Sequence, residues 1–429
     1  MEKRLRSESV TRTLRASFSA LAFGEAAARA FSFFAVLLLA RRLGPGAFGT
    51  VTLGTTLVAW FGLVADSGTE LVGVRDVSRN PAQVRHLCDR VLGLRLAVAL
   101  PAAAVFALVA SQVGRPGDQR TTLVLFAVVL PALAFNVRWM VLGVRGARAV
   151  AVGNIVSKAV LLAVVVLVVA GPRDLRSVPF LFLGAELAYG LVILALLARR
   201  LGVIVPRVDL AVWRSTLRQG FPLLAVSVVR ATSFSVDVIA VGLVLGTHDV
   251  GVYGAAAKPA LFATSAIGLF SVSFLSTYSG AARREGDDLL RTSLRPLLAC
   301  SLVAAVGLSA AAAAVVPLLF GHAYAAAVPV LAILAWRIPL TAFGSPYGTV
   351  LIAHRRQDVL LRNNAVGAAL GIAGCFALAP VAGLAGVAAA RVASSAVTTF
   401  LNYRTSTSLE LAPRLRGDRT LLAGAAVDA

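Results

Sequence analysis

The segment LGPGAFGTV, from Leu43 to Val51, is followed 202 positions later by a related segment, LGTHDVGVY, from Leu245 to Tyr253. A leucine and two glycines recur in register, and each segment comes after the first long apolar run of its half of the chain. A weaker match places Asn154 on Asn363 at an offset of 209. The repeat predicts two halves of similar construction that begin on the same side of a membrane, as parallel repeats do.

The apolar runs on both sides of these segments indicate the class of protein. Of the 429 residues, 58% are hydrophobic and only 14% are charged, and the mean hydropathy is +0.84. These values exclude a water-soluble enzyme with a single anchor and favour an all-α polytopic membrane protein. Runs of helical length predict twelve transmembrane helices, near residues 17–40, 48–74, 92–113, 121–143, 148–170, 177–198, 220–245, 250–277, 296–320, 324–352, 359–380 and 383–403.

The longest connection divides these helices into two six-helix bundles, 1–198 and 220–404, which we expect to be related by a pseudo-twofold axis along the membrane normal. Residues 199–219 then form a cytoplasmic linker, and residues 405–429 form a cytoplasmic tail. In the linker, Leu210, Trp213 and Leu217 lie at helical spacing among arginines. This pattern is typical of an amphipathic helix on a membrane surface, and a solvated linker is the alternative.

Positive charge outside the spans predicts the orientation of the chain. Lysine and arginine total 41 against 20 acidic residues, which gives a net charge of +21. The N-terminus and alternate connections hold 28 of these cations, with Arg95 counted among them, and the other connections hold six. Because lysine and arginine concentrate in short cytoplasmic loops, both termini are predicted to be cytoplasmic. The charge therefore requires no nucleic acid as a partner.

Motifs for catalysis and metal binding are absent from the sequence. It contains no GxxxxGK[ST] phosphate loop, no HExxH, no GxSxG and no DxD. The four histidines fall in separate connections, so we expect no metal site and no cofactor. The three cysteines lack paired or metal-like spacing and are interpreted as free thiols.

Charges inside the predicted spans are the remaining candidates for function, because charge is costly in hydrocarbon and usually faces a cavity or a partner. Seven cations exceed five acids, which predicts a net cationic cavity and an anionic substrate. The candidate substrate-binding residues are Arg29, Arg138, Lys158, Arg230, Lys258, Arg337 and Arg391. The candidate ion-coupling residues are Glu25, Asp66, Glu70 and Asp237, and the fifth acid is Glu186.

Spacing leaves structural alternatives open for several of these residues. Glu25 and Arg29 are one helical turn apart and could form a local ion pair. Asp66 and Glu70 are also one turn apart, so they could share a proton or Na⁺, or could simply end their span.

Three further residues have similar alternatives. Asp237 is two turns beyond Arg230 and could balance its charge or take a proton. Glu186 and Arg391 occupy comparable positions in the sixth and twelfth spans, and we expect them to form a structural pair across the two halves at least as readily as a functional site.

Four segments carry a resemblance to a known family: ARRLGPGAFGTVTLG (Ala40 to Gly54), ADSGTELVGVRDVSR (Ala65 to Arg79), QGFPLL (Gln219 to Leu224) and LGTHDVGVYGAAAK (Leu245 to Lys258). The chain resembles the Wzx-type flippases of lipid-linked oligosaccharides such as O-antigen precursors. These belong to the multidrug/oligosaccharidyl-lipid/polysaccharide exporter superfamily.

The resemblance implies a transporter and not an enzyme. It would move an undecaprenyl-diphosphate-linked oligosaccharide from the inner to the outer leaflet of the bacterial cytoplasmic membrane by alternating access, for cell-surface polysaccharide biosynthesis. We expect a monomer in contact with membrane lipids, with a polysaccharide polymerase as a candidate partner. The field of the membrane favours outward movement of an anion. Coupling to H⁺ or Na⁺ is left open.

Two other functions stay open at this point. A cation-coupled multidrug extruder of the same superfamily would need surplus acid in its cavity. The predicted spans of this chain instead contain more cations than acids. A polytopic glycan polymerase or ligase needs a sizeable outer loop, whereas the predicted outer connections are short.

Overall fold

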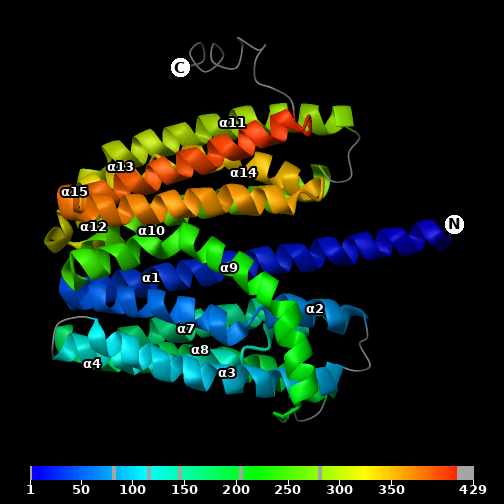
Figure 1. The fold of residues 1–429 in the computed structure, drawn as a ribbon, viewed down its shortest axis with the longest axis horizontal. Helices are drawn as coiled ribbons and strands as arrows, with labels where there is room; N and C mark the ends of the chain where they lie inside the picture. Colours follow the sequence, from blue (N-terminus) through cyan, green and yellow to red (C-terminus); the bar gives the residue numbers. More distant parts are fainter. Residues whose placement is uncertain are drawn as a thin grey trace. The chain divides into compact units, whose positions relative to one another are not determined.

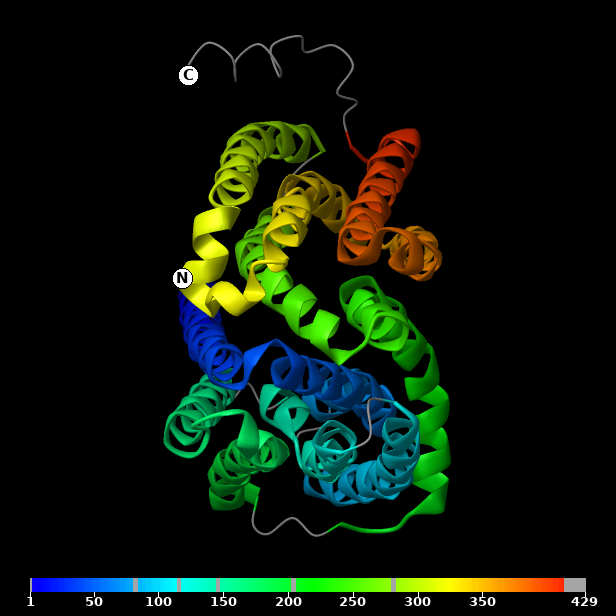
Figure 2. The same cartoon turned by 90° about the vertical axis from the view of Figure 1, so that its left-hand side faces the viewer.

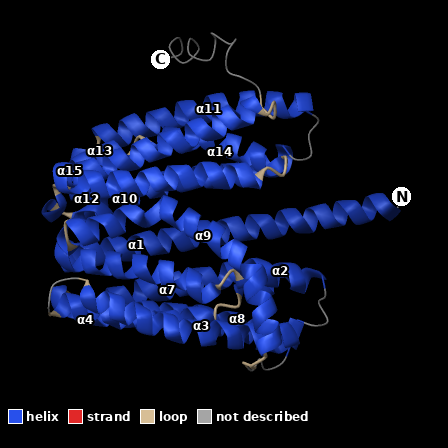
Figure 3. Ribbon diagram, in the orientation of Figure 1, coloured by secondary structure: helices blue, strands red, loops and turns tan. Residues whose placement is uncertain are grey.

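The computed structural model describes residues 2–79, 84–113, 117–143, 147–201, 206–278 and 283–412. These residues form α-helices joined by short 3-10 turns and loops, with no strand in the described ranges (Figures 1 and 3). The chain divides into two compact units, residues Met1–Val228 and Val229–Ala429. The division falls inside a single helix, α9 (Leu210–Val244), so the first turns of α9 belong to the N-terminal unit.

The N-terminal unit begins with a folded helix, α1 (Glu2–Asp66), whose backbone is non-helical at Gly44 (φ 72°, ψ 171°). Glycine accepts this left-handed φ without a steric penalty, and the following Pro45 suits the first turn of a new helix. Figure 1 shows the two arms of α1 running in opposite directions. They correspond to the predicted spans near 17–40 and 48–74. The remaining elements are α2 (Thr69–Arg79), α3 (Val84–Gln112), α4 (Asp118–Leu125), α5 (Val129–Ala134), α6 (Arg138–Gly143), α7 (Ala147–Val168) and α8 (Val178–Leu201).

Two predicted spans of this unit are interrupted in the structure. The second arm of α1 ends at Asp66, and a turn with positive φ at Ser67 and Gly68 precedes α2, so one straight helix to residue 74 is wrong. The predicted helix 121–143 is split into α4, a 3-10 turn (Phe126–Val128), α5 and α6. Pro131 removes a backbone donor near the break. The side chain of Asn136 accepts a hydrogen bond from the Arg138 backbone N–H at 3.2 Å, which caps the start of α6.

The C-terminal unit contains the rest of α9, then α10 (Thr247–Tyr278), α11 (Arg283–Ala310), α12 (Ala312–Phe320), α13 (Ala327–Leu334), α14 (Arg337–Ala353) and α15 (Gln357–Ser408). The last helix is folded at Gly383 (φ 55°, ψ −142°), three residues after Pro380. Its two arms, shown side by side in Figure 2, correspond to the predicted spans 359–380 and 383–403. They are joined by buried amides, because Asn363 Nδ2 donates to Asn402 Oδ1 at 3.0 Å.

The surfaces of both units are apolar where a bilayer would contact them. Leu167 in the N-terminal unit and Val381 in the C-terminal unit are each 82% exposed, and many other large apolar side chains are exposed. In water such surfaces would be unfavourable, whereas lipid solvates them. Eight helices of the described ranges are long and apolar enough to cross a membrane, with each folded helix, α1 and α15, counted once. The chain is therefore a multi-pass membrane protein, and the number twelve stays a prediction.

Candidate functional site

The charged side chains inside the helices form two groups, one in each compact unit, and each group is described by itself. Each of the five predicted intramembrane acids has one cation beside it in the structure. Pairing removes most of the cost of charge in a low-dielectric interior. The cations that have no acid beside them are therefore the stronger candidates for binding an anion.

In the N-terminal unit, Glu25 and Arg29 form the local ion pair that their spacing allows, with Arg29 Nε 3.4 Å from Glu25 Oε1. Asn154 of α7 donates a second hydrogen bond to the same carboxylate, 3.2 Å from its Oε2. Lys158, one turn further along α7, lies 3.2 Å from Glu186 of α8. Glu186 therefore has a partner inside its own unit, and the predicted pair with Arg391 is wrong.

Asp66 and Glu70 do not share one cation; each has its own. Arg138 lies 3.8 Å from Glu70, at a partly exposed position. Asp66 instead binds the guanidinium of Arg95, whose Nε also donates to Thr69 Oγ1 at 2.7 Å. The adjacent carboxylates are thus neutralised by cations from two different helices, α3 and α6.

Arg95 is a buried residue of α3 and not the loop cation that the charge pattern of the connections predicts. It is only 4% exposed, and its NH1 group donates to the carbonyl of Asn136 at the break between α5 and α6. Its guanidinium also lies 5.9 Å from the ring centroid of Trp139. The signal that could have identified it is its position inside the apolar run VLGLRLAVAL, within the predicted span 92–113. Arg95 joins the end of α1 to α3 and to the α5–α6 break.

Two buried hydroxyl groups lie near these charges without hydrogen-bond partners among the described residues: Ser157 Oγ on α7 and Tyr189 Oη on α8. The Tyr189 hydroxyl is within electrostatic range of Glu186, Glu70, Glu25 and Arg138. Buried polar groups normally find a partner in protein or water. The Tyr189 hydroxyl is therefore a buried polar site within electrostatic range of three glutamates.

In the C-terminal unit, Asp237 of α9 and Arg391 of α15 form an almost fully buried ion pair, with Arg391 Nε 3.2 Å from Asp237 Oδ2. Tyr253 of α10 donates its hydroxyl to the same carboxylate oxygen at 2.7 Å. The other carboxylate oxygen, Oδ1, accepts the backbone N–H of Val238 at 3.0 Å. Arg391 is thus the described cation that neutralises Asp237, whereas the side chain of Arg230 lies outside the described residues.

Two of the predicted intramembrane cations of this unit have no acid of their own among the described side chains, Lys258 on α10 and Arg337 at the start of α14. Arg337 Nε donates to Ser395 Oγ at 3.3 Å and lies within electrostatic range of Arg391 and Asp237. Lys258 makes no hydrogen bond or ion pair with any described residue. Among the predicted intramembrane cations whose side chains are described, these two are therefore the ones that form no ion pair with an acid.

Comparisons with known proteins agree with this architecture. Residues 14–279 match the family of polysaccharide biosynthesis proteins. No curated protein matches the chain. A lipid II flippase, MurJ, in an inward closed conformation has a TM-score of 0.74 at 13% identity, covering 92% of this chain and 88% of its own. A multidrug resistance MATE family transporter of the MOP superfamily, facing inward, has a TM-score of 0.72 at 15% identity, covering 89% and 94%.

A third solved structure is a MOP superfamily transporter from Pyrococcus furiosus Vc1, for which a binding pocket of reverse polarity is described. It has a TM-score of 0.60 at 14% identity, covering 93% of this chain and 95% of its own. These likenesses show the fold, which this chain shares with the three solved structures. The matched residues 14–279 cover well over half of the 429 positions, and the chain therefore belongs to the family of polysaccharide biosynthesis proteins.

Proposed function

We propose that this protein is a flippase that moves an undecaprenyl-diphosphate-linked oligosaccharide from the inner to the outer leaflet of the bacterial cytoplasmic membrane by alternating access. The observation that supports this most directly is the pair of cations without acids, Lys258 and Arg337. A diphosphate would supply the missing negative charge. The planar guanidinium of Arg337 suits phosphate oxygens, since it can donate two parallel hydrogen bonds.

The family and the fold point in the same direction. The family is that of polysaccharide biosynthesis proteins, and one protein of the same fold is a flippase of lipid II. On this basis we propose that the transported oligosaccharide is used in the biosynthesis of cell-surface polysaccharide. The membrane potential adds on the order of 2 kcal/mol per charge per 100 mV for outward movement of an anion. The charge pattern of the connections supports cytoplasmic termini, even with Arg95 removed from the loop cations.

For ion coupling, the polar site beside Tyr189 is the better candidate. Glu25 and Glu70 are partly exposed, and the Tyr189 hydroxyl lies near both. Asp66 and Asp237, the other two acids expected to couple, already bind the buried guanidinium groups of Arg95 and Arg391. A transported H⁺ or Na⁺ would have to compete with a buried cation at either of them, whereas the cations beside Glu25 and Glu70, Arg29 and Arg138, are partly exposed to solvent. We therefore propose that protons enter through the glutamates of the N-terminal unit.

The competing functions make different demands on the same residues. A cation-coupled drug extruder needs surplus acid at its binding site, and the described side chains carry surplus cation at Lys258 and Arg337. A polymerase or ligase would elongate the glycan rather than move it. Purified protein in liposomes distinguishes the three activities, because flipping, dye export and chain elongation give separate readouts.

The test uses proteoliposomes that contain a polyprenyl-diphosphate oligosaccharide with a fluorescent sugar, whose flipping is read by reduction of the exposed dye. Arg337→Ala and Lys258→Ala should each slow flipping about tenfold, as expected for one lost charge-assisted hydrogen bond. The matched control is Arg176→Ala, because Arg176 is exposed and pairs with Asp118 at 2.6 Å. Unchanged flipping in both cation variants, with the protein folded, would reject the proposed function.

A further inference from the structure

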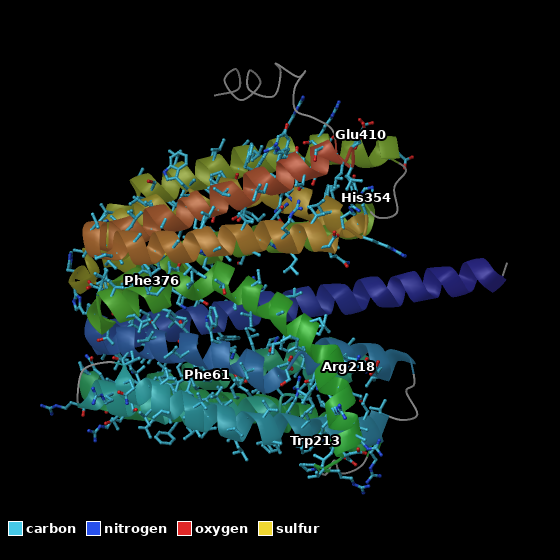
Figure 4. The ribbon with its side chains drawn as sticks, in the orientation of Figure 1. Phe61, Trp213, Arg218, His354, Phe376 and Glu410 are labelled. Atoms are coloured by element: carbon cyan, nitrogen blue, oxygen red, sulfur yellow. The ribbon has the colours of Figure 1, made fainter. Side chains whose placement is uncertain are left out.

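The first turns of α9, together with the loop before them, form a segment that we call the elbow, residues 206–221. It is attached to the start of α3 by several bonds. The Arg207 backbone N–H donates to the Asp89 carbonyl at 2.8 Å, and Trp213 Nε1 donates to the Arg90 carbonyl at 2.9 Å. Arg90 also forms an ion pair with Asp209 at 3.2 Å. Figure 4 shows Trp213 and Arg218 on this part of α9. The elbow is therefore fixed to the N-terminal unit.

One side of the elbow helix is packed against that unit. Thr216 and Gly220 are buried, and a Cβ at Gly220 would overlap the carbonyl oxygen of Ser67 in the turn after α1. Such an approach of two backbones leaves no freedom for rotation about the helix axis. This contact therefore sets the direction in which the exposed sides of the helix face.

A neighbouring side of the helix exposes an apolar stripe with a cationic edge. Leu210, Leu217 and Phe221 are 72%, 38% and 70% exposed and recur at helical spacing on one face. Arg214 and Arg218 are exposed beside this stripe and form no ion pair with any described residue. Asp209, the acid of the elbow, is already paired with Arg90, so the face carries uncompensated positive charge.

The depth of the elbow follows from its attachment. Asp89 and Arg90 lie in the first turn of the apolar stretch Leu87–Gln112, which is one of the candidate spans. A segment bound to that turn lies at the boundary between hydrocarbon and water. At this depth an apolar stripe enters the acyl region, and adjacent guanidinium groups reach the level of lipid phosphates.

We propose that the elbow is a binding site for anionic phospholipid of the surrounding bilayer, in which Arg214 and Arg218 bind headgroup phosphates and Leu210, Leu217 and Phe221 insert among the acyl chains. The charge of the face selects an anionic lipid over a zwitterionic one. The site is separate from the cations proposed to hold the transported substrate, and it does not depend on the identity of that substrate. Its occupant holds the elbow at the interface.

The first test measures lipid retention by the full-length protein. Wild-type protein is reconstituted in equal phosphatidylglycerol and phosphatidylcholine, extracted in mild detergent, and its bound lipid is measured by mass spectrometry. Wild-type protein should retain phosphatidylglycerol preferentially. The double variant Arg214→Gln/Arg218→Gln should reduce this preference by about fivefold for each arginine removed. The control Arg355→Gln/Arg356→Gln removes the same charge from an exposed connection of the C-terminal unit and should keep the preference. An equal loss in both double variants would overturn the proposal, since it would indicate a general charge effect.

The second test measures depth without relying on the arginines. A fluorophore on Leu210→Cys, in a background with Cys88, Cys300 and Cys375 replaced by alanine, should be quenched by lipids brominated on their upper acyl carbons. A label at Ser215, on the exposed side away from the stripe, should be quenched much less. Equal quenching at the two positions, or no difference between phosphatidylglycerol and phosphatidylcholine in the first test, would reject the site even if the flippase activity is confirmed.

Discussion

Arg391 and Asp237 form a nearly fully buried ion pair that joins α15 to α9 in the C-terminal unit, with Nε 3.2 Å from Oδ2. The Tyr253 hydroxyl donates to the same carboxylate. Removing one member of a buried pair leaves an uncompensated charge, whereas replacing both with apolar groups removes the cost of desolvation as well. The pair therefore has to be tested by single and double substitution.

Arg391→Met alone should destabilise the protein by about 3–5 kcal/mol, and Arg391→Met/Asp237→Leu should recover most of that loss. Thermal unfolding in detergent measures both variants. Flipping by the recovered double variant then shows whether Arg391 contacts substrate. Normal flipping would assign Arg391 a structural role, and lost flipping in a stable protein would place it among the substrate-binding residues.

Arg95→Ala should destabilise the N-terminal unit, because Asp66, Thr69 and the carbonyl of Asn136 all lose a donor. Arg95→Lys should restore only part of the stability, since an ammonium group cannot reproduce the fork of a guanidinium. Each buried group left without a partner costs about 1–3 kcal/mol. The control Arg176→Lys lies in an exposed pair and should change stability by less than about 0.5 kcal/mol. Equal stability of Arg95→Lys and wild type would contradict the bonding described for Arg95.

Tyr189→Phe removes a buried hydroxyl that has no hydrogen-bond partner among the described residues, while the ring that packs on Gly153 remains. We expect stability to stay within about 0.5 kcal/mol of wild type, because no hydrogen bond within the protein is lost. Flipping driven by an imposed pH gradient should fall, and flipping without a gradient should be retained. The comparison variant is Tyr347→Phe, a buried tyrosine of the C-terminal unit. If the response to the gradient is the same in both variants, Tyr189 has no part in coupling.

Gly68→Ala and Gly220→Ala should each destabilise the contact between the turn after α1 and the elbow. A Cβ at either glycine would overlap a backbone oxygen of the other segment, and Gly68 also has a φ of +72°. Overpacking of this kind costs about 1–3 kcal/mol. Gly268→Ala is the matched control, because its Cβ would meet open space in α10 and alanine favours helix. Thermal unfolding measures the stability of the three variants. If Gly268→Ala were destabilised as much as the other two, the described contact would be contradicted.

Much of the fold follows from local patterns that the sequence contains. Apolar runs of sufficient length require helices in a bilayer, because only internal hydrogen bonds satisfy the backbone there. The folded helices α1 and α15 bend at Gly44, which stands between two predicted spans, and at Gly383, which is the first residue of the last predicted span. The break between α5 and α6 within 121–143 is stabilised from another helix, because the Arg95 guanidinium donates to the Asn136 carbonyl there, and such a contact between distant segments is not evident from local sequence.

The candidate site can be predicted from the sequence only in part, because it also depends on contacts between helices that are distant in the chain. Composition determined that cations exceed acids within the spans, and this sum does not depend on how the helices pack. Only the tertiary structure decided which acid neutralises which cation, because partners such as Asp66 and Arg95 or Asp237 and Arg391 are brought together by packing of distant helices. Charge in a low-dielectric interior is stabilised by its nearest neighbours, so pairing rather than composition distinguishes Lys258 and Arg337, among the described intramembrane cations, as the two without an ion pair to an acid.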